Sequence, residues 1–346
     1  MTIPSNPWKN KKLPARVLAV RWQATGDVMI TLPYLHCLRK SLPPGTKLDL
    51  LTGEETAGVP KNIHLFDHVF SIGGGRHFKK QVLYTFLLLP RLFLRRYDVV
   101  IDLQNNGLSK IVRRALLPKA WSVFDRYSNL PAGERTRLTI EAAGLGGISL
   151  DTNYQLKNPG RGAAVLEKYG WNKKDKLVVL NPAGFFITRN WGMHNYIGFA
   201  QLWLQRFPDT RFLVLGTPVI AEKADVLQEA LGSRLINLVN KTSPEEAFAV
   251  LQHAMLVLSE DSGLMHMAWV SGVPTMTLFG STRSDWARPL GPHSFFLDSS
   301  DLPCGNCMQA NCRFGDVHCL SRYSPVIVFE LALALLQKTG KIPMSL

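Results

Sequence analysis

The sequence contains no run of 18 or more apolar residues, although 46% of its 346 residues are hydrophobic. A membrane-spanning helix needs about 20 such residues, so none is predicted. The N-terminal segment is basic but has no long apolar core ending in small residues, so no secretory signal is expected. These absences predict a cytoplasmic protein and leave peripheral attachment to the cytoplasmic membrane face open.

Two common phosphate-binding signatures are also missing. Neither G-x-G-x-x-G nor G-x-x-x-x-G-K-[ST] occurs in the chain. Their absence argues against a dinucleotide-dependent dehydrogenase and against a P-loop enzyme.

Acidic residues are scarce, with 26 Asp and Glu against 40 Lys and Arg. The resulting charge of +14 is uneven, because residues 1–158 carry +12 and residues 159–346 only +2. Such a field favours an anionic partner such as nucleic acid, a phosphorylated glycolipid or an anionic membrane face, and a merely basic soluble surface is the simpler alternative. Nucleic acid is disfavoured, because aromatic residues do not alternate with the basic ones as a stacking platform requires.

Apolar runs alternate with helical patterns along the whole chain, which is typical of parallel α/β domains. Pro- and Gly-rich sequence near residues 158–162 predicts a boundary between a domain of residues 1–158 and one of residues 159–346. Strands are expected at 15–20, 47–52, 68–72, 98–103, 176–184, 211–216, 235–239, 256–259 and 275–280. Helices are expected at 29–40, 77–96, 163–169, 195–207, 219–231, 243–254, from 264 and at 324–338, and the last of these is free to pack back on the first domain.

The most informative segment is LSEDSGLMHMAWVSGVPTMTLFG (258–280). It predicts a strand, a turn at Asp261, Ser262 and Gly263, a helix that places His266 on its first turn, and a second strand. Free N–H groups and the positive end of a helix dipole at such a turn suit a phosphate or diphosphate. The alternative is that Asp261 and Ser262 merely cap the helix and that His266 is an ordinary helix residue.

Two further segments carry candidate residues. RWQATGDVMITLP (21–33) follows the first predicted strand and places Asp27 where ligands of α/β sheets bind, although Asp27 is also a plausible N-cap. ITRNWGMHNY (187–196) offers Arg189, which can pair with phosphate, or which is one more surface cation beside an anchoring Trp191. Small residues such as Gly184 before it would let a nucleotide approach the backbone.

Together these motifs resemble glycosyltransferase family 9, the ADP-heptose:lipopolysaccharide heptosyltransferases. The family carries D-[TS]-G-x-x-H followed by G-x-P, a strand and a glycine, matched here from Asp261 through His266 to Gly280. It also carries R-x-x-x-x-G-D and K-x-W-P-x-x-x-[WFY]. In the last of these, Arg189 stands in place of Lys and Gly192 in place of Pro, which leaves the local geometry open.

The resemblance implies a GT-B architecture, in which two Rossmann-like domains face a cleft. It implies that Asp27 is the catalytic base of an inverting sugar transfer that needs no cofactor, and that domain closure brings it to the donor. The first domain would bind an anionic glycolipid acceptor beside the inner membrane. The second would bind a nucleotide-diphospho-sugar through Gly184, Arg189, Asp261, Ser262, Gly263 and His266. A non-catalytic nucleotide-sugar or glycan-binding protein of the same fold is the alternative function.

Four of the five cysteines, Cys304, Cys307, Cys312 and Cys319, lie within sixteen residues, and Cys37 is expected in the core. Their spacing is compact enough for one tetrahedral zinc or iron ion. Free or redox-sensitive thiols are the alternative, and disulfides are disfavoured in the cytosol. The resemblance adds that one related branch of the family holds iron at a comparable cluster. A closed thiolate site would be structural rather than catalytic.

The segment VLYTFLLLPRLFLRRY (82–97) is apolar with basic ends but too short to span a bilayer. Such a helix can lie on a membrane surface. A buried core helix with basic ends is the alternative.

Overall fold

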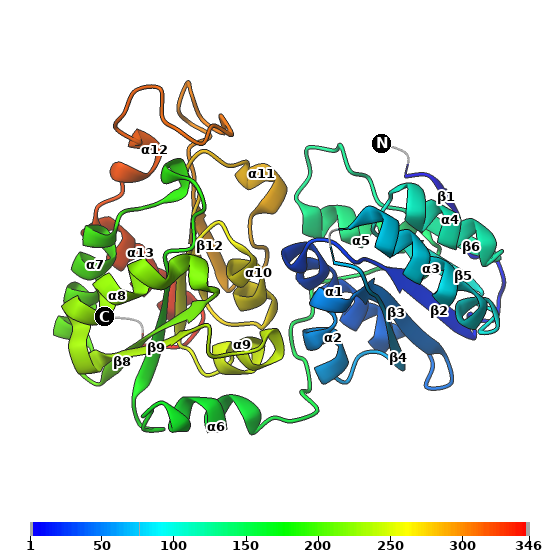
Figure 1. The fold of residues 1–346 in the computed structure, drawn as a ribbon, viewed down its shortest axis with the longest axis horizontal. Coiled ribbons are helices and arrows are strands. Elements are labelled where there is room, and N and C mark those ends of the chain that lie inside the picture. Colours follow the sequence, from blue (N-terminus) through cyan, green and yellow to red (C-terminus); the bar gives the residue numbers. More distant parts are fainter. Residues whose placement is uncertain (1–2, 76, 344–346) are drawn as a thin grey trace. The chain divides into compact units, whose positions relative to one another are not determined.

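The computed structural model describes residues 3–75 and 77–343. Arg76, one of the basic residues of the first domain, lies outside this part. The chain divides into two compact units, Met1–Lys157 and Asn158–Leu346, and each is built around its own sheet (Figure 1).

The first unit is a doubly wound α/β sheet with one antiparallel edge. Strand β2 lies centrally, and chain order proceeds outward from it through β3 and β4 on one side and β5 and β6 on the other, with β1 paired antiparallel to β6 at the edge. In sheet order the strands are β1 (Ser5–Asn6), β6 (Ala120–Val123), β5 (Val99–Asp102), β2 (Arg16–Val20), β3 (Lys47–Gly53) and β4 (His68–Ile72). The helices are α1 (Thr25–Ser41), the 3-10 helix η1 (Glu54–Thr56), α2 (Gly58–Asn62), α3 (Phe78–Phe93), α4 (Gly107–Ala115) and α5 (Ala132–Ala142).

The second unit repeats this plan with an entirely parallel sheet. In sheet order its strands are β12 (Ser294–Leu297), β11 (Thr275–Leu278), β10 (Leu256–Glu260), β7 (Lys176–Asn181), β8 (Thr210–Gly216) and β9 (Leu235–Val239). Its α-helices are α6 (Arg161–Lys168), α7 (Met193–Arg206), α8 (Ala221–Leu231), α9 (Pro244–Leu251), α10 (Gly263–Val270), α11 (Ser284–Ala287), α12 (His318–Ser321) and α13 (Pro325–Lys338). Its 3-10 helices are η2 (Ile187–Arg189), η3 (Pro218–Ile220) and η4 (Gly232–Arg234).

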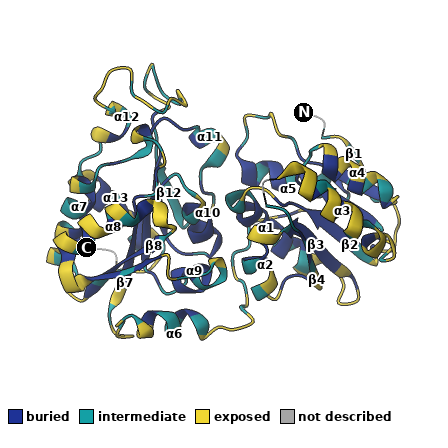
Figure 2. Ribbon diagram, viewed as in Figure 1, coloured by how far each residue is buried: buried dark blue, intermediate teal, exposed yellow. Residues whose placement is uncertain are grey.

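Burial explains why these segments form strands and helices. The interiors of the central strands are almost wholly buried, as expected for parallel sheets covered on both faces, whereas the edge strands β4 and β12 are only partly buried (Figure 2). Aromatic side chains of α7, including Phe199 and Trp203, pack with Phe329 of α13 in the core of the second unit. The final helix therefore contributes its buried side chains to this core. The predicted α/β fold class is confirmed.

The helix cap predicted from the sequence at the start of α9 is present in the structure. Ser243 Oγ accepts a hydrogen bond from the Glu246 N–H, and Glu246 Oε2 accepts one from the Ser243 N–H, so the predicted capping box begins α9. Helix α3, by contrast, is not a buried core helix. It buries Leu92 on one side and exposes several large apolar side chains on the other.

Candidate active site

Each sheet has one position where the strand order reverses, and ligands of doubly wound folds bind there, beyond the carboxyl ends of the strands. In the first unit it lies between β2 and β5, and α1, which carries Asp27, follows β2. In the second unit it lies between β7 and β10. Gly184 and Arg189 follow β7, and Asp261 through Gly263 follow β10, so two segments far apart in sequence meet at one point.

Asp27 is the third residue of α1, and its carboxylate is held at one oxygen. Oδ2 accepts a hydrogen bond from the Ala24 N–H at 3.0 Å and pairs with Nη2 of Arg21 at 2.9 Å. The capping alternative is thus partly realised, at the third helical position rather than at the N-cap. The side chain is 39% exposed, and among the described residues both contacts use Oδ2. No contact of Oδ1 is recorded with the residues that the structure describes.

Arg21 lies behind this carboxylate and is 8% exposed. Its guanidinium lies 5.0 Å from the Phe124 ring centroid and donates to the Leu103 carbonyl. Burial lowers the pKa of Arg21, and the Asp27 carboxylate opposes that shift. No role for Arg21 was predicted from the sequence, although its place in the R-x-x-x-x-G-D pattern was a usable signal.

The turn after β10 begins helix α10 with Ser262 as its N-cap. Ser262 Oγ accepts from the Met265 N–H at 3.3 Å, and the Asn181 side chain donates to it at 2.8 Å. At Gly263 an added Cβ would meet no atom within 4 Å, so protein packing does not require a glycine there. His266 is nearly buried, and its Nδ1 accepts from the Trp269 indole at 3.3 Å.

The Arg189 side chain extends toward this turn. Its Nη1 lies 3.8 Å from Oδ2 of Asp261, and its guanidinium lies 5.1 Å from the Phe186 ring centroid. Only 22% of the side chain is exposed, and Nε is buried with no hydrogen-bond partner among the described residues. The Arg189 side chain is therefore mostly enclosed by the protein and lies beside the Asp261 carboxylate. Trp191 is the expected anchor, because it is buried and its indole donates to the Tyr323 carbonyl at 2.7 Å.

A buried carboxylate that the sequence analysis missed lies beneath this loop. Glu260 Oε2 accepts from the Gly184 N–H and Oε1 from the Trp191 N–H, both at 2.6 Å. Burial raises the pKa of Glu260 to about 7, against the lowering effects of the Trp191 N–H and of Lys223. No local sequence pattern predicts these contacts, because the residues that form them lie about 70 positions apart in the chain.

Gly192 has φ +88°, a left-handed conformation that favours glycine. Proline has a fixed φ near −65° and cannot adopt this conformation. The backbone that leads into α7 therefore differs here from any backbone that carries proline at this position.

Gly280, which follows β11, must be a glycine for steric reasons, because an added Cβ would lie 1.9 Å from the Thr188 carbonyl oxygen. The variant Gly280→Ala should therefore lose about 1–3 kcal/mol of unfolding free energy by overpacking, measured by urea denaturation. The matched substitution Gly263→Ala adds the same methyl group where nothing lies within 4 Å and should leave the unfolding free energy nearly unchanged. Equal losses in both variants would contradict this explanation.

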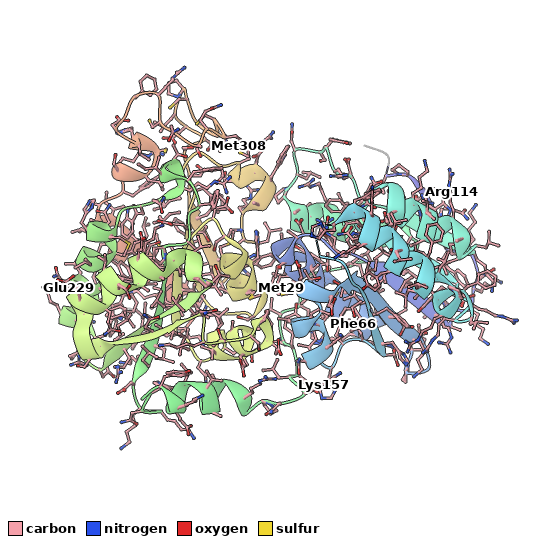
Figure 3. The ribbon with its side chains drawn as sticks, in the orientation of Figure 1. Met29, Phe66, Arg114, Lys157, Glu229 and Met308 are labelled. Atoms are coloured by element: carbon pink, nitrogen blue, oxygen red, sulfur yellow. The ribbon has the colours of Figure 1, made fainter. Side chains whose placement is uncertain are left out.

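The four clustered cysteines line one cavity of about 770 Å³ in the loop between β12 and α12, where Figure 3 labels Met308. All are free thiols, and burial together with the other three cysteines raises the pKa of Cys319 to about 11. Among residues 3–75 and 77–343, no group of three or more His, Cys, Asp or Glu side chains is placed to hold a metal ion. The expected zinc or iron at Cys304, Cys307, Cys312 and Cys319 is therefore not supported, and neither is a disulfide.

Cys37 was expected in the core, but it is only partly buried on α1, within reach of Ser149.

The loop between β12 and α12, which carries the clustered cysteines, contacts the loop between β7 and α7, which carries Arg189. The contact is made by Thr188, whose hydroxyl donates to the Gln309 carbonyl at 2.6 Å.

In the part of the chain that the structure describes, no helix is both long and apolar enough to cross a bilayer.

Comparison with known proteins finds relatives that share one family. Lipopolysaccharide heptosyltransferase 1 of Pseudomonas aeruginosa is 26% identical over 337 residues, covering 86% of this chain and 88% of the relative. The crystal structure of a family 9 glycosyltransferase from Veillonella parvula matches with a TM-score of 0.77 at 18% identity, covering 94% of this chain and 97% of that one. The structure of the E. coli heptosyltransferase WaaC with ADP-2-deoxy-2-fluoro heptose matches with a TM-score of 0.65 at 19% identity, covering 92% of this chain and 99% of that one.

These matches confirm the predicted GT-B fold class. The model of the family described as glycosyltransferase family 9 (heptosyltransferase) covers residues 119–318, more than half of the sequence. The chain therefore belongs to glycosyltransferase family 9 and is a glycosyltransferase.

Proposed function

We propose that this enzyme transfers a heptose from ADP-heptose to an anionic lipopolysaccharide-core acceptor, with inversion at the anomeric carbon and without a cofactor. The observation that carries the proposal is the meeting of Arg189, Asp261 and Gly263 where the strand order of the second sheet reverses. The reaction needs both units, because the proposed base lies in the first and the proposed diphosphate contacts lie in the second.

The donor is assigned from the chemistry of the turn after β10. The N-terminal N–H groups of α10 and the Arg189 guanidinium favour a diphosphate. The open space at Gly263 lets that diphosphate approach the backbone. ADP-heptose is favoured over other nucleotide sugars because WaaC, a structural match, was solved with ADP-2-deoxy-2-fluoro heptose. The name of the Pseudomonas aeruginosa relative supports a lipopolysaccharide acceptor.

The chemical step is a displacement at the anomeric carbon. The acceptor oxygen forms a bond to this carbon as the bond to the diphosphate oxygen breaks, and ADP leaves with the electron pair. Oδ1 of Asp27 takes the proton of the acceptor hydroxyl, while Arg21 and the Ala24 N–H hold Oδ2. Arg189 and the N–H groups of α10 stabilise the charge that develops on ADP.

The proposal is tested by following ADP release and product mass with ADP-heptose and a delipidated lipopolysaccharide-core acceptor. GDP- and UDP-sugars serve as competing donors. Transfer with ADP-heptose alone is expected, and the product linkage should have the anomeric configuration opposite to that of the donor. Retention of configuration would contradict the role of Asp27 as base, and turnover only with a GDP- or UDP-sugar would contradict the donor assignment.

Peripheral membrane contact is part of the same proposal and concerns helix α3. Lys79, Lys80 and Arg91 on α3 and Arg96 beyond it are exposed and add positive charge that anionic headgroups attract. Figure 2 shows exposed residues along this helix. Large apolar side chains are exposed at Phe78, Leu83, Tyr84, Phe86, Leu87 and Phe93.

The variant Leu87→Glu should weaken binding to vesicles that contain phosphatidylglycerol by at least about tenfold, since burying one leucine contributes about 1.5–3 kcal/mol. Leu87 is 68% exposed, so folding should be unaffected. Co-sedimentation measures the effect. Val219→Glu in the second unit, where Val219 is 74% exposed, is the matched control and should bind vesicles like the wild type. Equal binding by the Leu87 variant would remove α3 from the membrane contact.

A further inference from the structure

The loop between β7 and α7 carries Arg189, and both of its ends are held by one carboxylate. Glu260 accepts the N–H of Gly184 at the start of the loop and the N–H of Trp191 at its end, each at 2.6 Å. It is the last residue of β10 and is 1% exposed. Each carboxylate oxygen therefore fixes one end of a loop that has six residues between the two contacts.

A half-buried cation holds the carbonyl side of the same loop. Lys223 Nζ donates to the Pro182 carbonyl at 2.7 Å and to the Gly184 carbonyl at 3.4 Å, and it also contacts the Asn190 side chain. Lys223 and Glu260 attract each other across the loop. Glu260 thus binds two N–H groups of this loop and Lys223 binds two of its C=O groups, so the loop has little conformational freedom.

The position of Arg189 depends on these anchors. Trp191 follows it by two residues, and Gly184 packs so closely that an added Cβ would lie 2.3 Å from the Arg189 carbonyl oxygen. The Arg189 side chain reaches Asp261, the residue directly after Glu260. Glu260 therefore holds the backbone of the loop, and the next residue, Asp261, pairs with the cationic side chain of the loop.

We propose that Glu260 is a positioning residue for donor binding, which fixes Arg189 against the diphosphate through the Gly184 and Trp191 N–H groups. The inference rests on the proposed function, because it requires Arg189 to contact the diphosphate. Glu260 acts only through the loop, since it is buried and each of its oxygens already accepts a backbone N–H. A preorganised cation binds a diphosphate more tightly because less ordering is required on binding.

A double-mutant cycle on the full-length protein tests this inference, with ADP as the probe and calorimetry as the measurement. Glu260→Gln replaces one acceptor oxygen by an NH₂ group, which cannot accept a backbone N–H. It should weaken ADP binding by about tenfold, which corresponds to the loss of one charge-assisted hydrogen bond. In the Arg189→Ala background the same substitution should have no further effect.

Glu229→Gln is the control, because it removes an exposed carboxylate from α8 of the same unit, and it should leave ADP binding unchanged (Figure 3). If Glu260→Gln does not fold, Lys223→Met replaces it in the cycle with the same expectation. Wild-type ADP affinity in the Glu260 variant, or losses that add in the double variant, would overturn the positioning role alone. Wild-type affinity in Arg189→Ala would overturn both this role and the proposed diphosphate contact.

Discussion

Replacement of Asp27 by asparagine is expected to lower kcat for sugar transfer by about 100- to 10,000-fold, the usual contribution of a general base. The amide keeps the shape of the side chain but cannot take the acceptor proton. ADP binding should change by less than about threefold, because the contacts proposed for the diphosphate lie in the second unit. Steady-state transfer kinetics and calorimetry with ADP separate these two effects.

The matched control is Asp67→Asn, which removes another ion-paired carboxylate of the same unit. Asp67 pairs with Lys47 at 2.9 Å and precedes β4, so it lies at the opposite end of the sheet from Asp27. The Asp67→Asn variant should keep the wild-type kcat. Asp27→Asn leaves the buried Arg21 without its anion, so the unfolding free energy of each variant must be measured as well. A folded Asp27→Asn enzyme with more than a tenth of the wild-type kcat would exclude Asp27 as the base.

Replacement of Arg189 by alanine should weaken ADP binding by about 10- to 150-fold, because hydrogen bonds to charged groups contribute about 1.5–3 kcal/mol. The loss should lie toward the upper end of this range. Asp261 lies 3.8 Å from the guanidinium, and without Arg189 its carboxylate would face the diphosphate uncompensated. Arg189→Lys keeps the charge but not the planar fork, so an intermediate affinity is expected.

Calorimetry at two salt concentrations checks this prediction, since ionic contacts weaken as salt rises. Arg206→Ala, at the far end of α7 from the loop, removes an exposed arginine from the same unit and should bind ADP normally. If Arg206→Ala and Arg189→Ala lose affinity equally, the effect reflects the overall charge of the unit and not a contact with the diphosphate.

Strands that coincide with a continuous apolar run were the most predictable part of the fold. The β-branched and aromatic runs at His68–Ile72 and Leu235–Val239 form strands with the expected bounds. The strands at Ala120–Val123 and Ser294–Leu297 were missed. Each has only four residues, so the local pattern carries little information about it.

The candidate site was predictable where one motif contains both its turn and its polar residues, as at Asp261, Ser262 and Gly263. It was not predictable where tertiary packing alone brings residues together. Glu260 reads as the end of an apolar strand, and Lys223 as one more surface lysine of a helix. Their shared role depends on the path of the loop between β7 and α7, which no local periodicity encodes. The assignment of Asp27 and of the donor residues to their roles stays a prediction.

The left-handed backbone at Gly192 has a consequence for engineering by consensus. A redesign that replaces unusual residues by the commonest residue of the family would introduce proline at this position. The ring would force φ from +88° to a negative value directly after Trp191, one of the two attachment points of the Arg189 loop. Restoring the proline of the family pattern would therefore damage this enzyme, because the chain at this position adopts a positive φ that proline cannot reach.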